Sequence, residues 1–325
     1  MLGGEKMIEV KDLVKRYDGH IAIDGLSFSV DKGEVVGFLG PNGAGKSTTM
    51  NIITGYIPAT EGTVVVDGHD IMEEPQLVKK SIGYLPEIPP LYPDMRVIEY
   101  LSFVAELKNV DKKKRGAMIE EIMGLTGILD RKLQLIKHLS KGYKQRVGLA
   151  SAIMGYPEVI ILDEPTVGLD PMQIIEIRDL IKKLSKDHTV ILSSHILSEV
   201  SAVCDKIMII NKGKLIVSDT PQNLTNRMQT AQVIELLIKG SQEMVEKAFE
   251  GLMETIKEMK VEEMGEDECR LIITGNGTED IREVIFYTLA DAKCPILEMK
   301  ASTMSLEDIF LEVTKEEGTN DACNL

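Results

Sequence analysis

The segment Gly40–Ser47, GPNGAGKS, has the residue types needed to bind a triphosphate. It matches the pattern G-x-x-x-x-G-K-[ST] and directly follows the apolar run Val35–Leu39, the context that this pattern requires. Glycines let successive N–H groups point at one anion, and a helix opening at Lys46 adds its positive end. An unrelated glycine turn with a stray lysine is the alternative, which the strand and the intact Gly-Lys-Ser disfavour. The candidate nucleotide ligands are Gly40, Asn42, Gly43, Gly45, Lys46, Ser47 and Thr48.

Two adjacent acids, Asp163 and Glu164, follow the apolar run Val159–Leu162. Ligands bind beyond the carboxyl ends of strands in open α/β sheets, which is where this pair would lie. Asp163, with the Ser47 hydroxyl, is a candidate magnesium ligand, and Glu164 is a candidate base for an attacking water. An acidic loop after a strand would be the default interpretation without the phosphate loop. With that loop present, the two motifs together predict hydrolysis.

Apolar strands separated by helices must position both motifs. The runs Glu158–Leu162 and Thr189–Leu192 flank a helical pattern over Met172–Ser185, so we predict a parallel sheet covered on both faces. The other predicted elements are a strand over Met7–Lys15, a hairpin over Phe28–Val36 that turns at Gly33, a helix from the phosphate loop to about Thr54, a strand over Thr63–Asp67, and helical patterns over residues 73–155 interrupted by prolines.

The charge of the 325-residue chain is concentrated in its last hundred residues. Residues 1–225 hold 27 Lys and Arg against 30 Asp and Glu, whereas residues 226–325 hold 10 against 22, which is −12 of the total −15. This shift predicts a domain boundary near Thr225 and argues against nonspecific binding of nucleic acid or anionic lipid through the tail. A merely solvated acidic domain would have the same composition.

The tail predicts a small α+β domain. Its pattern reads as strand, helix, strand, strand, helix, strand, which suggests a ferredoxin-like fold. The predicted strands are Ala231–Ile238, Ile256–Glu263, Cys269–Thr274 and Pro295–Lys300, and the predicted helices are Glu243–Met253, Glu279–Ala290 and a final Ser305–Lys315.

Cysteine use and hydropathy predict a cytoplasmic protein. The four cysteines form no C-x-x-C pair and have no metal-ligand spacing, so we expect reduced thiols. The first residues lack the apolar core of a signal peptide, and no stretch approaches 18 apolar residues. If the protein works at a membrane, we expect another chain to provide the span.

Several further motifs occur in a characteristic order, and with them residues 7–225 resemble the ATP-binding cassette (ABC) ATPases. Leu139–Ala150, LSKGYKQRVGLA, resembles the family signature, and Val167–Pro171 resembles the loop after the catalytic glutamate. Ser193–His195 resembles the switch histidine, and Tyr17 lies where the family stacks an aromatic ring on adenine, although a tyrosine there could also be plain packing.

The resemblance implies a phosphate-loop α/β cassette that works as a dimer. Its parts would be a mixed sheet with flanking helices, an antiparallel β subdomain and a helical subdomain at about residues 88–155, within an ATPase domain at 7–225 that an accessory domain at 226–325 follows. Two cassettes close over two ATP molecules in this family, and magnesium accompanies each. Ser140 and Gly142 would contact the γ-phosphate held by the other chain, and Asp170 would couple the two sites. Glu164 would be the general base, and His195 would contact the γ-phosphate.

Two motifs depart from the family pattern, at three positions. Lys141 and Tyr143 replace the usual glycine and glutamine of the signature, and Lys141 adds positive charge near the partner's phosphates or nearby solvent. Glu87 replaces a glutamine that senses magnesium, and its carboxylate could meet the metal directly or through water. The segment from Ile88 to Phe103 lies where transport members receive a membrane subunit. Exposed Tyr84 and Tyr92 with their prolines would suit docking there, and a rigid surface loop is equally compatible.

The favoured function is the ATPase subunit of a transporter with separately encoded membrane permeases. The end of the chain, Met304–Thr314, resembles the C-terminus of exporter-type cassettes, so export is favoured over import. Such a subunit would be peripheral on the cytoplasmic face of the membrane. A soluble cassette ATPase acting on DNA or the ribosome is the alternative, but the chain lacks a basic arm and a cysteine cluster, so no nucleic acid is expected. A small-molecule kinase fails to account for the signature and the histidine.

Overall fold

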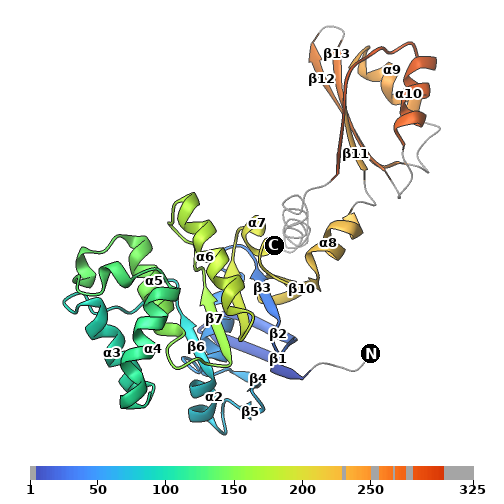
Figure 1. Ribbon diagram of the computed structural model, residues 1–325. Helices are drawn as coiled ribbons and strands as arrows, with labels where there is room; N and C mark the ends of the chain where they lie inside the picture. Colours follow the sequence, from blue (N-terminus) through green and yellow to red (C-terminus); the bar gives the residue numbers. More distant parts are fainter. Residues whose placement is uncertain (1–4, 229–231, 250–255, 266–267, 276–280, 304–325) are drawn as a thin grey trace. The chain divides into compact units, whose positions relative to one another are not determined.

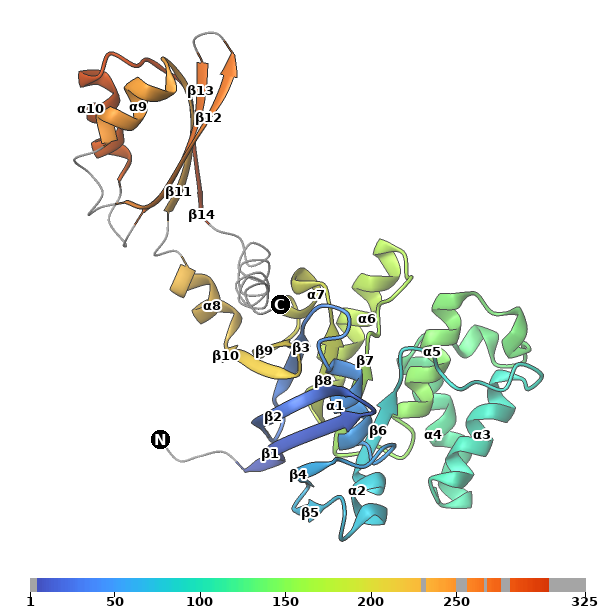
Figure 2. The same ribbon diagram turned by 180° about the vertical axis from the view of Figure 1, so that it is seen from behind.

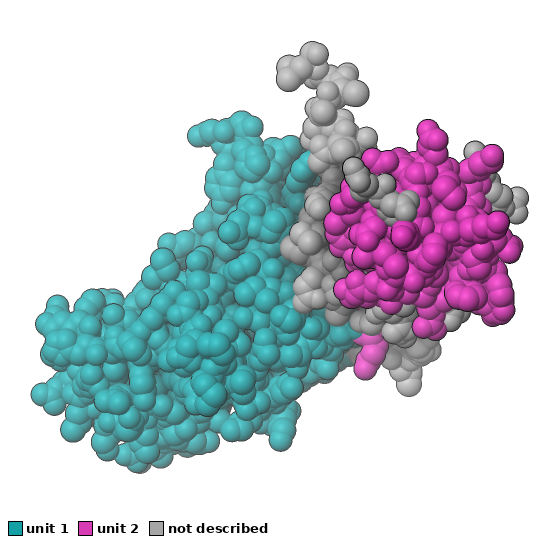
Figure 3. Space-filling view, turned by 90° about the horizontal axis from the view of Figure 1, so that it is seen from above, with its two compact units in different colours: residues 1–221 teal, residues 222–325 magenta. Residues whose placement is uncertain are grey.

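The computed structural model describes residues 5–228, 232–249, 256–265, 268–275 and 281–303. Contacts between residues divide the chain into two compact units, Met1–Pro221 and Gln222–Leu325, which are coloured separately in Figure 3. Each unit has a buried apolar core of its own. The acidic tail is therefore held together by apolar packing in spite of its excess of carboxylates.

A six-stranded sheet forms the centre of the first unit, in the order β10-β9-β3-β8-β7-β6 (Figure 1). Neighbouring strands from β9 to β6 are parallel, and β10 is antiparallel to β9. Every residue of β3, β7 and β8 is buried, which confirms the predicted two-faced apolar strands. The strands are β3 (Val35–Leu39), β6 (Ile82–Leu85), β7 (Val159–Asp163), β8 (Thr189–Ser194), β9 (Lys206–Asn211) and β10 (Lys214–Asp219).

A second, antiparallel sheet packs against the first. Its order is β2-β1-β4-β5, made of β1 (Lys6–Tyr17), β2 (His20–Asp31), β4 (Glu61–Val66) and β5 (His69–Asp70) (Figure 2). Side chains of both sheets share one core, where the rings of Phe28 and Phe38 meet edge to face at 4.9 Å between centroids. This core holds the antiparallel strands beside the phosphate loop.

The predicted hairpin over Phe28–Val36 is wrong. Phe28 belongs to β2, which pairs with β1, whereas Val36 belongs to β3, which pairs with β8 and β9. Gly33 has a φ of 76° and turns the chain from one sheet into the other. The burial patterns give the physical reason, because β2 has one packed face while β3 is buried on both faces and needs neighbours along both edges.

Helices flank the sheets, and three of them gather beside β6 at one end of the unit (Figure 1). These three, α3 (Val97–Leu107), α4 (Lys112–Leu125) and α5 (Lys141–Ala152), confirm the helical patterns expected after the prolines. The sequence interpretation missed β6 inside that region, because four residues carry little periodicity. The remaining helices of the unit are α1 (Lys46–Ile53), α2 (Pro75–Ser81), α6 (Pro171–Leu184), α7 (Leu197–Ser201) and, at the boundary, α8 (Pro221–Met228), with 3₁₀ turns at Leu129–Arg131 and Ile136–His138.

The second unit has the predicted ferredoxin-like topology. Its strands form an antiparallel sheet in the order β12-β13-β11-β14, and both helices lie on one face (Figure 1). Alternate residues of β13 are buried beneath these helices, as a one-faced sheet requires. The elements are β11 (Gln232–Lys239), α9 (Gln242–Phe249), β12 (Ile256–Gly265), β13 (Glu268–Gly275), α10 (Arg282–Asp291) and β14 (Ile296–Thr303). The predicted final helix, Ser305–Lys315, lies outside the described residues.

Candidate active site

The phosphate loop lies between the end of β3 and the start of α1. Its Gly43 and Gly45 have φ of 83° and 103°, a backbone region that side chains disfavour. A Cβ on Gly45 would also lie 2.7 Å from the Ala22 carbonyl oxygen of the neighbouring strand. Glycine is therefore required at position 45 by backbone conformation and by space.

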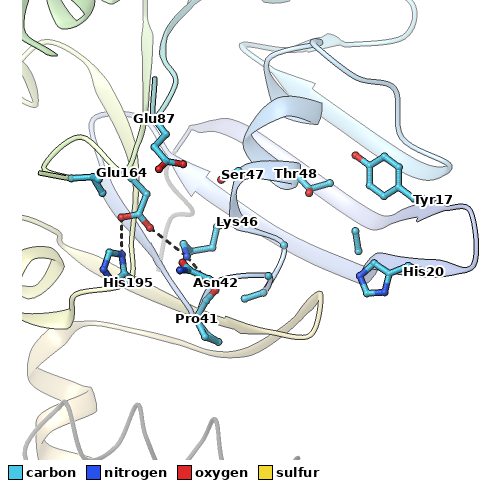
Figure 4. A pocket seen from close by; sticks show the side chains of 15 residues that line it. Tyr17, His20, Pro41, Asn42, Lys46, Ser47, Thr48, Glu87, Glu164 and His195 are labelled. Carbon is cyan, nitrogen blue, oxygen red and sulfur yellow. Dashed lines mark hydrogen bonds and ion pairs between the residues drawn. The ribbon is translucent and has the colours of Figure 1, made fainter. Parts of the chain in front are cut away.

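A pocket of about 470 Å³ opens over this loop (Figure 4). Tyr17 and His20 lie at one end, and Glu164 and His195 lie at the other, beyond Lys46. Ten of the predicted site residues line it: Tyr17, Asn42, Gly43, Gly45, Lys46, Ser47, Thr48, Glu87, Glu164 and His195. An elongated pocket with a ring at one end and charged groups at the other has the layout of a nucleotide site.

The Lys46 side chain is buried at the charged end of the pocket. Its ammonium donates hydrogen bonds to the carbonyl oxygens of Gly40, at 2.8 Å, and Pro41, at 3.3 Å. It also lies 3.4 Å from Glu164 Oε1. The lysine is only 6% exposed, so these partners compensate a charge that has lost most of its water. Gly40 itself does not line the pocket, and its contribution here is the carbonyl that holds Lys46.

Glu164 lies between Lys46 and His195. Its Oε2 is 3.0 Å from His195 Nδ1, and its Oε1 faces the lysine (Figure 4). Glu164 has a φ of +49°, which costs an ordinary residue about 1–2 kcal/mol. Its backbone N–H donates to Ser193 Oγ at 2.9 Å, so the neighbouring strand β8 holds the turn in place. The carboxylate is thereby directed into the pocket from the end of β7.

Asp163 lies beneath the pocket and is almost fully buried. Its Oδ1 accepts hydrogen bonds from Ser193 Oγ at 2.5 Å and from Ser47 Oγ at 3.2 Å. A hydroxyl and a carboxylate side by side, with the Glu87 carboxylate lining the pocket above, are the oxygen donors that magnesium prefers. The three predicted metal ligands therefore fit this ion, which when bound supplies positive charge to phosphate oxygens.

Three predicted nucleotide contacts, Ser140, Gly142 and Asp170, do not line the pocket. Ser140 caps the N-terminus of α5, and Asp170 caps α6 by accepting a hydrogen bond from the Gln173 N–H at 2.9 Å. Gly142 packs against Gln173, whose side chain lies 2.5 Å from where a Cβ would be. Within one chain these residues lie apart from the pocket at the start of two helices, with Ser140 and Asp170 exposed and Gly142 buried.

One expectation about a residue near the site is wrong. Tyr84 is not exposed, because its ring packs against the core and its hydroxyl donates to Asn51 Oδ1 at 3.1 Å. Burial and the nearby Asp163 carboxylate raise the pKa of this hydroxyl, which stays protonated. Tyr92 is half exposed and contacts Tyr100 and Phe103.

The Lys141 side chain lies over Gly168, with its Nζ 2.0 Å from where a Cβ would be. It therefore packs against the loop after Glu164 in its own chain.

The sequence interpretation missed some pocket residues. His20 pairs directly with Tyr17 across the β1–β2 turn, and this register could have been inferred from the Asp18-Gly19 turn signal. Ser193 lies outside the pocket lining and was seen only as a neighbour of His195, although its hydroxyl contacts both Asp163 and the Glu164 backbone. The other missed lining residues are Ala22, Pro41, Ala44 and Val167.

Three features meet at the ends of parallel strands: a phosphate loop, a buried acidic pair and a histidine. Together they define a phosphate-loop nucleoside triphosphatase. The family model described as "ABC transporter" matches residues 23–167. The uncharacterized ABC transporter ATP-binding protein YhcH of Bacillus subtilis is 38% identical over 95% of this chain and 96% of its own length. This protein belongs to the ABC transporter family, as an ATP-binding subunit that hydrolyses ATP.

Two further comparisons extend this result. The linearmycin resistance ATP-binding protein LnrL of Bacillus subtilis is 34% identical over 95% of this chain and 98% of its own length. The dimeric ATP-binding cassette MJ0796, solved in a post-hydrolysis state with ADP and Pi, is 25% identical with a TM-score of 0.62. The match covers 66% of this chain and 98% of that cassette. None of the helices in the described part of the chain has the length and hydropathy of a membrane span.

Proposed function

We propose that the protein is the ATPase subunit of an exporter and works with separately encoded membrane permeases as a dimer of cassettes. The observation that carries the proposal is the contact of Glu164 with both Lys46 and His195 at one end of the pocket. A carboxylate, a lysine and a histidine in contact there suit the phosphate chemistry of ATP hydrolysis. The ATPase domain is assigned to residues 7–225, with its helical subdomain at about 88–155, and residues 226–325 form the accessory domain.

The pocket residues divide the work of hydrolysis among them. Tyr17 would stack on the adenine, while the phosphate-loop backbone and Lys46 would bind the phosphates. Ser47, Asp163 and Glu87 would hold magnesium through oxygen atoms. Glu164 would accept the proton of the attacking water, and His195 would contact the γ-phosphate and keep that carboxylate in position.

A second cassette would complete the site. Ser140, Gly142 and Asp170 lie outside their own chain's pocket, at helix starts whose N–H groups favour anions. The MJ0796 cassette, which this chain resembles, is dimeric with bound ADP and Pi. We therefore assign Ser140 and Gly142 to the γ-phosphate held by the partner, and Asp170 to the coupling of the two sites.

Replacing Ser140 by arginine tests the shared site. Ser140→Arg places a long cation where the partner's nucleotide would enter, so turnover should fall at least about tenfold because one face of the transition-state contacts is lost. ATP affinity of the monomer should stay within about twofold, because Ser140 does not line that pocket. Steady-state ATPase assays and equilibrium nucleotide titration measure both quantities.

Ser241→Arg is the matched control, since Ser241 is also an exposed residue directly before a helix, in the second unit. It should leave turnover unchanged. Normal turnover in Ser140→Arg would mean that each chain hydrolyses ATP without a partner's signature helix.

Export through separate permeases is tested by purification from native membranes. LnrL, a relative that matches 95% of this chain, is named for resistance to linearmycin, which favours an export system. The tagged chain, bound at the cytoplasmic face, should co-purify with a multi-span membrane protein. Vesicles that contain this complex should move substrate outward when ATP is supplied. Co-purification with ribosomes or DNA instead of a membrane protein would contradict the proposal.

A further inference from the structure

A buried carboxylate, Glu199, connects the two loops that carry the reacting side chains. It lies in the five-residue helix α7, which begins two residues after His195, and is only 7% exposed. Its Oε2 accepts hydrogen bonds from the hydroxyl of Thr166 and, at 3.4 Å, from that of Ser194. Thr166 follows Glu164 by two residues, and Ser194 immediately precedes His195. One oxygen atom therefore joins the loop of the proposed base to the loop of the histidine.

Glu199 is an expensive residue to bury at this position. Within the described part of the chain, the two hydrogen-bond donors to its carboxylate are neutral hydroxyls and not cations. Removing a carboxylate from water costs several kcal/mol, which two hydroxyl hydrogen bonds offset only in part. An apolar side chain of similar volume at this position would make the folded state more stable. The polar arrangement is better explained by the geometry that it imposes.

The surrounding bonds show what that geometry is. Ser193 holds Asp163 and the backbone of Glu164, and His195 contacts the Glu164 carboxylate. Ser194, the residue between them, contacts Glu199 and also accepts the Ile196 N–H at 3.0 Å. Three consecutive residues at the end of β8 thus contact the segment that ends β7 and the loop after it. Ser193 and His195 do so directly, and Ser194 does so through Glu199. Among the described residues, the Thr166 hydroxyl reaches the β8 side through Glu199.

We propose that Glu199 is a positioning residue, which holds the Thr166 loop and the Ser194 turn together so that Glu164 and His195 point at the same phosphate. The proposal rests on the function assigned above to Glu164. Glu199 does not line the pocket, so it acts through other residues and not on ATP itself. A shift of about 1 Å in a reacting group can cost roughly 100-fold in rate, so loose loops would slow hydrolysis without weakening ATP binding.

The test compares variants of the full chain at the two ends of the bridge. Glu199→Ala and Thr166→Val should each lower kcat roughly 10–100-fold while KM and nucleotide affinity change less than about threefold. Thr166→Ser, which keeps the hydroxyl, should retain most of the native kcat. The double variant should be no slower than the slower single variant, because both remove the same bridge. Glu120→Ala removes an exposed carboxylate on α4 and should leave kcat unchanged.

Each outcome decides one point. A kcat within about twofold of native in a folded Glu199→Ala or Thr166→Val, or kcat losses that multiply in the double variant, overturns the inference. The inference is also overturned if Thr166→Ser is as slow as Thr166→Val, because the hydroxyl would then be irrelevant. If Glu199→Ala fails to fold, Thr166→Val and Thr166→Ser still give the answer. The proposed function fails separately, when Glu164→Gln keeps native turnover.

Discussion

Glu164→Gln is expected to lower steady-state ATP turnover by about 10²–10⁴-fold, the usual contribution of a general base. Glutamine keeps the shape of the side chain but cannot accept the proton of the attacking water. The Lys46 and His195 contacts of the native carboxylate show that the side chain already lies beside the lysine that we propose binds the phosphates. ATP should therefore still bind, and the complex should remain in the ATP-bound dimer that hydrolysis normally dissolves.

Three measurements check this result together. Phosphate release gives turnover, nucleotide titration gives affinity, and light scattering with and without ATP gives the dimer. Glu120→Gln changes an exposed carboxylate on α4 in the same way and should behave as native protein. Turnover at the native rate in Glu164→Gln would remove Glu164 from the role of base, and His195 or a phosphate oxygen would have to replace it.

Lys46→Ala is expected to weaken ATP binding by about 100-fold. A charge-assisted hydrogen bond contributes about 1.5–3 kcal/mol, and about 2.7 kcal/mol corresponds to a factor of 100 in the dissociation constant. In the nucleotide-free chain the same lysine compensates Glu164, which is buried with it. The melting temperature should therefore fall as well. Without Lys46, the buried Glu164 carboxylate keeps the His195 contact but loses its contact with a cation.

Lys132→Ala is the control for this variant. Lys132 is partly exposed and pairs loosely with Glu120 at 3.9 Å, a contact worth at most about 1 kcal/mol. Calorimetric titration of ATP and thermal unfolding of both variants separate the two effects. Undiminished ATP affinity in Lys46→Ala would contradict the assignment of this lysine to the phosphates.

Local patterns were sufficient for the parts of the site that one segment supplies. The phosphate loop needs positive φ at Gly43 and Gly45, and only glycine meets that need readily, so the motif could be recognised from residue types. The acidic pair could be recognised for a similar reason. Strand β7 is buried on both faces, so its residues are apolar until its last position, where the two acids begin. The tail topology was also readable, because its strands alternate and its helices have separate apolar faces.

Pairing between distant segments was harder to predict. Phe28 and Val36 have the spacing of a hairpin, yet they enter different sheets, because burial on both faces of β3 outweighs the local turn at Gly33. Tyr84 was expected at the surface, but the strand that contains it adds to the edge of the six-stranded sheet and turns its ring toward the core. In both cases long-range strand pairing decided what the local sequence left ambiguous.

The residue types alone determined that this chain binds a triphosphate and carries an acid beside it, since those groups are contiguous in the sequence and their chemistry is local. The tertiary structure alone decided how the groups act on one another. Lys46, Glu164 and His195 follow three different strands, β3, β7 and β8, and Glu199 meets Thr166 across 33 residues. Contacts of this kind depend on the register of parallel strands, which places segments side by side irrespective of their distance along the chain.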